Sequence, residues 1–163
     1  MQNRKFDCRT DILLICCVKF RSDLVFILDE GGEFDAPVEK FWRFMSTPGD
    51  HHKHASMSNR KFEKDGNNTV MSFEVESPYG AKTQVKIRSS PLVPVGRMLE
   101  YLEGPLAGSK VMSYYIPKGQ KTGVTLVGEY VSKVIPEGQI KTVVMNQLEQ
   151  SFKEDTENLK NFQ

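Results

Sequence analysis

The sequence feature that most constrains the fold is a long helical pattern at the end of the chain. Residues 139–163 contain no proline or glycine and follow the turn signal Pro136-Glu137-Gly138. Apolar residues recur in this run at spacings of four and seven, as on one face of an amphipathic helix: Ile140, Val144, Leu148, Phe152 and Leu159. The pattern therefore predicts one long terminal helix that buries a single face against the rest of the chain.

Most of the chain before this helix has the pattern of β-strands. The apolar residues at 24–28 predict a first strand, and six further strands are predicted at 57–64, 68–76, 81–89, 95–103, 110–117 and 122–134. Short turn signals rich in Gly, Pro and Asn separate the later strands, so neighbours are expected to pair antiparallel in a meander. Gly31-Gly32 predicts a bulge or bend after the first strand.

Two short helices are predicted between the first strand and the meander. Pro37 stands at a first helical position with Glu39 in the first turn, and the apolar spacing changes there from two to about 3.6 residues. Thr47 as cap, followed by Pro48 and by Asp50, predicts a second short helix. The economical arrangement is an α+β fold in which an antiparallel sheet curves around the terminal helix.

Charge and length limit the class of protein. The 163 residues are enough for one domain with its own core. The 22 basic and 21 acidic residues are spread along the chain, leaving a net charge of +1 and no basic stripe. The sequence therefore predicts no nucleic-acid partner, and it leaves the oligomeric state open.

Residues 1–22 are predicted to be an N-terminal extension of uncertain structure, preceding a domain at 23–163. The apolar run 12–18 resembles a signal-peptide core, but Asp7 and Asp11 interrupt the basic region that should precede it. The run is also too short to span a bilayer, so no integral membrane association is expected.

The three cysteines, Cys8, Cys16 and Cys17, all lie in this extension. They form no Cys-x-x-Cys pair, and an odd number is a poor basis for a disulfide framework. We therefore expect a cytoplasmic location and packed, unreactive thiols.

Residues 34–42, with the sequence FDAPVEKFW, resemble the I-x-A-P-x-x-x-V-W junction common in the START-like superfamily. This superfamily includes the Bet v 1 allergens, the polyketide cyclases and the lipid-transfer START domains. Residues 123–130 and 136–138 support the resemblance, which covers roughly 23–162. It implies the helix-grip fold, with a cavity enclosed between the sheet and the last helix, and it implies no cofactor.

The expected partner is a small hydrophobic or amphipathic ligand held in this cavity. Alternating strand residues and the apolar stripe of the terminal helix supply the walls. The predicted ligand-binding residues are Met71, Phe73, Val75, Val85, Ile87, Leu99, Tyr101, Tyr115, Val127, Glu129, Val144 and Leu148. Of the adjacent pair Tyr114 and Tyr115, only one can point inward, and the sequence does not decide which.

Three functions remain open: a non-enzymatic carrier or sensor, a polyketide cyclase or aromatase, and a protein-interaction module. The enzyme hypothesis uses Glu129 and a cavity tyrosine. Glu129 resembles a cavity-facing glutamate in the plant hormone receptors of this superfamily and would act as general acid or base. The alternative is that Leu126 and Tyr130 face inward and Glu129 faces water. The interaction module predicts a filled core and an exposed apolar patch.

The three histidines cluster at His51, His52 and His54. Imidazoles bind transition metals well, but apart from Asp50 no nearby residue completes a ligand set. We therefore predict no metal site and place the histidines on a titratable surface helix near the mouth of the cavity.

Overall fold

The protein is described by a computed structural model in which residues 24–29, 31–49, 51–76 and 82–163 are placed. In chain order the elements are β1 (Leu24–Asp29), β2 (Glu33–Phe34), α1 (Val38–Ser46), β3 (Met57–Asp65), β4 (Asn68–Glu76), β5 (Lys82–Leu92), β6 (Gly96–Glu103), β7 (Lys110–Lys118), β8 (Lys121–Val131) and α2 (Glu137–Lys160). The predicted extension at 1–22, with its three cysteines, lies outside these residues.

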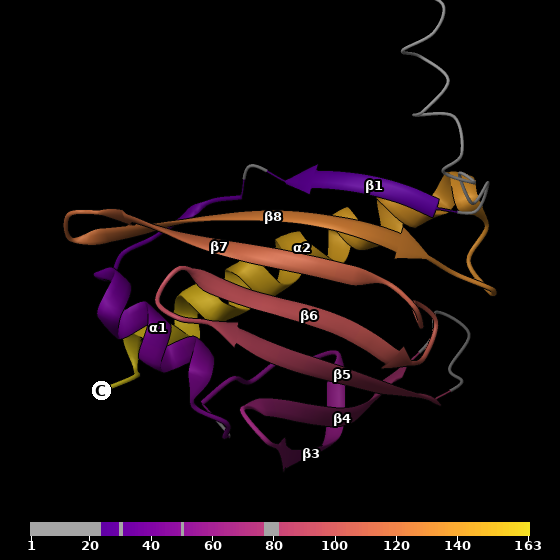
Figure 1. Ribbon diagram of the computed structural model, residues 1–163, viewed down its shortest axis with the longest axis horizontal. Coiled ribbons are helices and arrows are strands. Elements are labelled where there is room, and N and C mark those ends of the chain that lie inside the picture. Colours follow the sequence, from indigo (N-terminus) through magenta and orange to yellow (C-terminus); the bar gives the residue numbers. More distant parts are fainter. Residues whose placement is uncertain (1–23, 30, 50, 77–81) are drawn as a thin grey trace, which may run out of the picture.

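The strands form one antiparallel sheet in the order β1-β8-β7-β6-β5-β4-β3, with β2 also paired to β8 (Figure 1). Consecutive strands from β3 to β8 are neighbours, so the predicted meander is confirmed. The predicted strand limits agree closely with the observed ones, because hairpin turns carry strong local signals. Two strands differ clearly at their ends: β5 continues to Leu92, beyond the predicted limit of 89, and β8 ends at Val131, before the predicted limit of 134.

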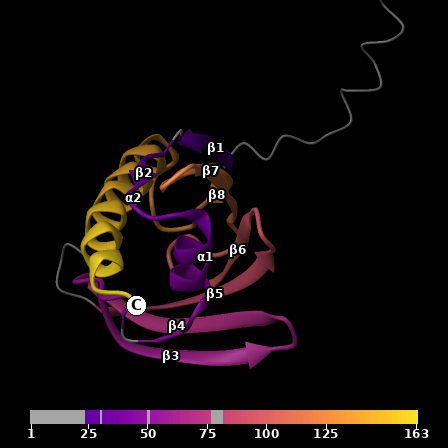
Figure 2. The same ribbon diagram turned by 90° about the vertical axis from the view of Figure 1, so that its left-hand side faces the viewer.

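Helix α2 confirms the predicted terminal helix and closes the open side of the curved sheet (Figure 2). It contacts β1 and β8 at one edge of the sheet. Ile140 and Val144 in its first half are buried in a core cluster with Ile27, Val111 and Tyr130. Burial of this apolar stripe is what stabilises a helix of this length against fraying.

The described residues between β2 and β3 contain one short helix, α1, where two were predicted. The prediction of a second helix after Thr47 is wrong. The Thr47 backbone N–H donates to the Arg43 carbonyl at 3.0 Å, which ends α1, and Thr47 itself is extended. A residue that precedes proline, as Thr47 precedes Pro48, is disfavoured in the helical region, which explains why α1 stops at Ser46. After Pro48, the His51 and His52 rings lie within hydrogen-bond distance of the Phe44 carbonyl oxygen, so the chain turns back toward α1 instead of starting a second helix. The described residues between α1 and β3 form turns and bends instead.

The predicted irregularity at Gly31-Gly32 is confirmed as a bulge opposite β8. Asp29 pairs with Leu126 and Glu33 pairs with Gly123, so four residue steps on one strand oppose three on the other. Gly31 has a φ of +70°, and a Cβ built on it would lie 1.6 Å from the Val124 carbonyl oxygen. The bulge therefore depends on glycine for both its backbone conformation and its space.

The bulge predicts that Gly31→Ala destabilises the fold. The positive φ alone costs about 1 kcal/mol, and displacing the Val124 backbone should bring the total to roughly 2–4 kcal/mol. Gly66→Ala is the matched control, because Gly66 has a similar φ of +60° but nothing within 4 Å of the added Cβ. Urea unfolding of both variants measures the difference. Equal losses in the two variants would contradict the proposed close approach to Val124.

Candidate functional site

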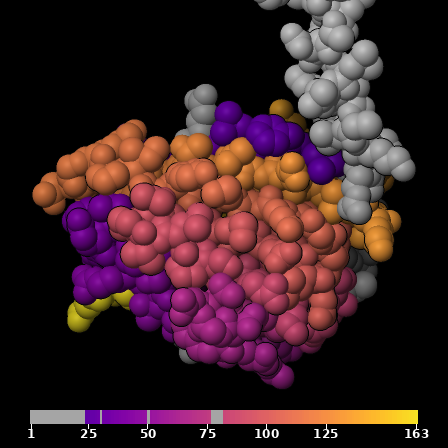
Figure 3. All heavy atoms as spheres, viewed as in Figure 1, coloured from indigo at the N-terminus to yellow at the C-terminus, as the bar shows by residue number. Residues whose placement is uncertain are grey.

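A cavity of about 720 Å³ lies between α1, α2 and the concave face of the sheet. Cavities of roughly 300–1,000 Å³ are the usual size for small-molecule sites. On the opposite, outer side of the sheet, the described strands present a continuous surface of side chains (Figure 3). The size and position of this cavity match those expected for a ligand held between the sheet and the last helix.

Seven of the residues predicted to contact a ligand line this cavity. They are Met71, Ile87, Leu99, Tyr101, Tyr115, Val144 and Leu148. Between them they provide walls from β4, β5, β6, β7 and α2, so one chamber collects side chains from distant parts of the sequence. Their contact with a ligand remains a prediction.

The other predicted residues are not in its lining. Phe73 and Val85 are buried in a core cluster that Val75 packs against. All three side chains lie on the inward face of their strands, as the alternation predicted, but neighbouring side chains separate them from the cavity. Strand periodicity does not reveal this covering. Val127 is also absent from the lining.

Glu129 was placed on the wrong face of β8. It is exposed, and it pairs in register with Phe26 of β1, which is 62% exposed, and with Lys110 of β7. Leu126 and Tyr130 line the cavity instead. Glu129 therefore cannot act as an acid or base inside the cavity, and the alternative facing is the one the structure adopts.

The structure also decides between the two adjacent tyrosines. Tyr115 is 3% exposed and lines the cavity, whereas Tyr114 is 37% exposed on the outer face. Burial raises the pKa of Tyr115, of Tyr101 and of Tyr130, and for Tyr130 the neighbouring Tyr101 and Asp29 raise it further. All three hydroxyls are neutral at ordinary pH, so they serve as hydrogen-bonding groups and not as phenolate bases.

Two residues that line the cavity each have a buried polar atom without a well-formed hydrogen bond within the described chain, namely the Tyr115 hydroxyl and the Arg97 Nε. The Arg97 guanidinium is near enough to Tyr115 to oppose the rise that burial causes in the pKa of its hydroxyl. Arg97 uses its Nη1 to donate to the Met45 carbonyl at 3.4 Å. Buried polar groups are normally paired, because desolvation without a partner costs about 1–3 kcal/mol. These two groups are therefore candidates to meet a polar part of a ligand.

The histidines belong to a connecting segment that is fastened to the second half of α2, so their placement on a surface helix was wrong. The Ala55 N–H donates to Glu154 Oε1 at 3.2 Å, and the Asn158 amide donates to the Lys53 carbonyl at 3.0 Å. The His52 and His54 side chains are only 15% and 11% exposed. The segment therefore packs on the helix instead of lying in solvent.

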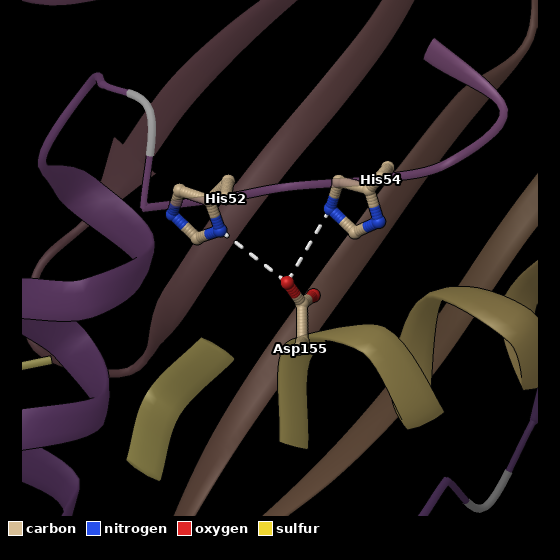
Figure 4. Close-up of side chains that lie close together, drawn as sticks. All are labelled: His52, His54 and Asp155. Atoms are coloured by element: carbon tan, nitrogen blue, oxygen red, sulfur yellow. Dashed lines mark hydrogen bonds and ion pairs between the residues drawn. The ribbon is translucent and has the colours of Figure 1, made fainter. Parts of the chain in front are cut away.

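Asp155 of α2 lies between His52 and His54 (Figure 4). Its Oδ1 is 3.3 Å from His52 Nδ1 and 3.3 Å from His54 Nε2. Burial by itself would raise the pKa of Asp155, but the polar contacts and charges of the two histidines lower it to about 2. Burial lowers the pKa of His52, whereas for His54 the carboxylates of Asp155 and Glu154 outweigh burial and raise it.

Sequence reasoning missed Asp155 as the acidic partner of the histidines, although a signal was present. Asp155 follows Phe152 by three residues and precedes Leu159 by four, so it occupies the one polar position within the apolar stripe. A carboxylate on a buried helix face needs a partner. Arg97 was also missed, because in sequence it is one charged residue of a strand among many.

The described surface also carries exposed apolar side chains. Phe26 is 62% exposed and Leu28 is 58% exposed on β1 at the edge of the sheet. The interaction-module hypothesis expected such a patch, but it also expected a filled core, and the cavity contradicts that. The apolar edge therefore does not by itself favour this hypothesis over ligand binding.

Comparison with solved structures identifies the fold. Searches of protein-family models and of curated proteins found no match. The allergen Ara h 8.0201 aligns with a TM-score of 0.65 and 10% identity over 85% of this chain and 99% of that chain. Norcoclaurine synthase from Thalictrum flavum, in complex with dopamine and hydroxybenzaldehyde, aligns with a TM-score of 0.62 and 14% identity over 100% of this chain and 99% of that chain.

The di-domain ARO/CYC StfQ from the steffimycin biosynthetic pathway aligns with a TM-score of 0.65 and 10% identity over 85% of this chain. The chain spans 50% of that protein's length. The chain therefore has a Bet v 1-like, helix-grip fold, as the resemblance at residues 34–42 predicted. None of the helices in the described part of the chain has the length and apolar character needed to cross a membrane.

The unpaired hydroxyl predicts that Tyr115→Phe does not destabilise the protein. Removing a buried hydroxyl without a partner should leave the free energy of unfolding unchanged or raise it by up to about 1 kcal/mol. Tyr114→Phe, on the outer face, controls for the loss of a hydroxyl in water. Urea unfolding of both variants tests this, and a loss of more than about 1 kcal/mol for Tyr115→Phe would show that its hydroxyl is bonded.

Proposed function

We propose that the protein binds a small amphipathic molecule, with its apolar body in the cavity and its polar end against Arg97 and Tyr115. The observation that carries the proposal is that an apolar chamber is lined by Arg97 and Tyr115, each of which has a buried polar atom without a well-formed hydrogen bond. Ligand pockets commonly combine apolar walls with a few convergent polar groups. Because Arg97 is a cation, a carboxylate, sulfonate or phenolate is the favoured polar end.

We favour a carrier or sensor over a cyclase, acting on a lipid-like or polyketide-like molecule in the cytoplasm. The residue on which the enzyme hypothesis depended, Glu129, is exposed. The cavity tyrosines have raised pKa values, so they favour recognition over proton abstraction. Some structures with this fold are enzymes, among them norcoclaurine synthase and the ARO/CYC protein StfQ. Conversion of a bound molecule is therefore the alternative outcome of the binding experiments.

Native mass spectrometry of gently purified protein gives the first test. We expect an additional mass in the native spectrum that disappears on denaturation and reports the size of the bound molecule. Incubation of ligand-free protein with mixtures of fatty acids and polyphenols should restore an adduct. A protein that stays at its bare mass after both treatments contradicts the proposal.

A cavity-filling substitution should abolish binding of an anionic apolar probe, 1-anilinonaphthalene-8-sulfonate. Leu148→Trp places an indole in the chamber, whereas Val143→Trp adds the same group to a position on α2 that is 40% exposed. We expect fluorescence titrations to show at least 10-fold weaker binding for Leu148→Trp and little change for Val143→Trp.

Tyr115→Phe, which is expected to fold normally, should weaken the probe several-fold because it removes one polar contact. Equal binding by wild-type protein and Leu148→Trp would place the probe on the exposed apolar edge and contradict a cavity site.

A further inference from the structure

The side chains of His52, His54 and Asp155 form a cluster in which hydrogen-bond acceptors face one another. These residues come from the segment before β3 and from α2, more than 100 residues apart. The three potential ligand atoms lie within 4.8 Å of one another. All three residues also line the cavity, so the cluster faces the chamber and not bulk water.

Each histidine has one ring nitrogen already committed to an acceptor. His52 Nε2 lies 2.7 Å from the Phe44 carbonyl oxygen, which can only accept, so this nitrogen carries the proton and donates. His54 Nδ1 lies 2.7 Å from the Glu154 carboxylate and donates to it for the same reason. In a neutral imidazole the other nitrogen then bears a lone pair.

Those lone pairs are directed at the carboxylate of Asp155, which is itself an acceptor. His52 Nδ1 and His54 Nε2 both lie 3.3 Å from Asp155 Oδ1, as Figure 4 shows. Charge-assisted N–H···O bonds are shorter, at about 2.7–2.9 Å. Three electron-pair donors that converge in this way need positive charge among them, and either a proton on an imidazole or a metal ion can supply it.

From this convergence we propose that His52 Nδ1, His54 Nε2 and Asp155 bind one divalent transition-metal ion at the cavity wall. Zn²⁺ is bound by histidine and carboxylate at about 2.0–2.2 Å, so two ligand atoms on the same ion are about 3.0–3.5 Å apart. Both nitrogen–oxygen separations, at 3.3 Å, fall in that range. The three ligand atoms lie within 4.8 Å of one another, so the two imidazoles would draw together to share one ion. Two imidazoles with one carboxylate suit Zn²⁺ or Fe²⁺ and leave coordination positions open.

The groups around the cluster match the outer shell that metal-binding histidines use. A histidine ligand almost always donates its second N–H to a carboxylate or a backbone carbonyl, which fixes the tautomer and the orientation of the ring. Here Glu154 does this for His54 and the Phe44 carbonyl does it for His52. The Arg60 guanidinium also donates to the His52 carbonyl and fixes the backbone of the segment.

A metal ion at this cluster would add a binding group to the proposed ligand cavity, but its binding does not depend on an organic ligand. An ion here would have its open positions on the chamber that Tyr115 and Arg97 also line. A chelating oxygen or a phenolate of a ligand could then occupy a coordination position. Metal binding is measurable with no organic ligand present, so either proposal can fail while the other stands.

The test is binding of Zn²⁺ and Co²⁺ to the full chain without a tag at neutral pH. We expect one equivalent of Zn²⁺ to remain after gel filtration, a visible Co²⁺ absorption that Zn²⁺ displaces, and a thermal midpoint that rises with Zn²⁺ and falls again with EDTA. Wild-type protein that retains no Zn²⁺ and gives no Co²⁺ absorption overturns the proposal, whatever the variants do.

Four variants locate the ion. Asp155→Asn and His54→Gln each remove a ligand and should weaken Zn²⁺ at least about 100-fold, while Glu154→Ala removes only the orienting group and should weaken it about 10–100-fold. His51→Gln changes the neighbouring histidine, which lies outside the cluster, and should bind as the wild type does.

Replacing Cys8, Cys16 and Cys17 together by serine should also leave binding unchanged. Circular dichroism checks that each variant is folded. Loss of binding in His51→Gln or in the triple serine variant, with retention in both folded ligand variants, would assign the ion to another site and refute the proposal.

Discussion

The structure depends on the way α2 is packed into a core cluster near each of its ends while side chains between these ends line the cavity. In the first half, Ile140 and Val144 are buried against β1 and β8. Near the C-terminus, Leu159 is buried in a cluster with Phe41 and Phe44 of α1. Between these contacts, Leu148 and Phe152 line the cavity. Because both ends of α2 are packed into the core, the helix and the sheet enclose a space between them, and that space is the candidate site.

The polar contacts at the C-terminal half of α2 join the fold to its chemistry. Asp155 stands where the apolar stripe would place a hydrophobic residue, and it meets His52 and His54 there. A buried carboxylate is costly unless charge or hydrogen bonds compensate it, so α2 and the segment before β3 hold each other in place. The same arrangement brings two imidazoles and a carboxylate to the wall of an apolar chamber. The side chains of His52, His54 and Asp155 therefore both position α2 and form the proposed metal site.

Local patterns carried most of the architecture. Alternation and turn residues located β3 to β8 to within three residues at each end, and Pro136-Glu137-Gly138 marked the start of α2 at Glu137. The second short helix failed because contacts outside the local pattern prevailed over the capping signal at Thr47: the His51 and His52 rings lie at the Phe44 carbonyl oxygen. Strand alternation also placed Met71 and Ile87 at the cavity but could not distinguish them from Phe73, which neighbouring side chains cover. Alternation predicts which face of the strand a side chain lies on, whereas its exposure to the cavity depends on the side chains that pack over it.

By itself, the sequence determined an antiparallel meander, a long amphipathic helix at its end and the junction typical of a helix-grip fold, since these follow from periodicity and turn chemistry within short windows. Tertiary structure alone decided which face of β8 points inward, placing Tyr130 in the cavity and Glu129 in water. It also brought Asp155 to the histidines and left the Tyr115 hydroxyl and the Arg97 Nε without a well-formed hydrogen bond. The physical reason is range: the meeting of side chains 100 residues apart is set by how sheet and helix pack, and no local pattern encodes that distance.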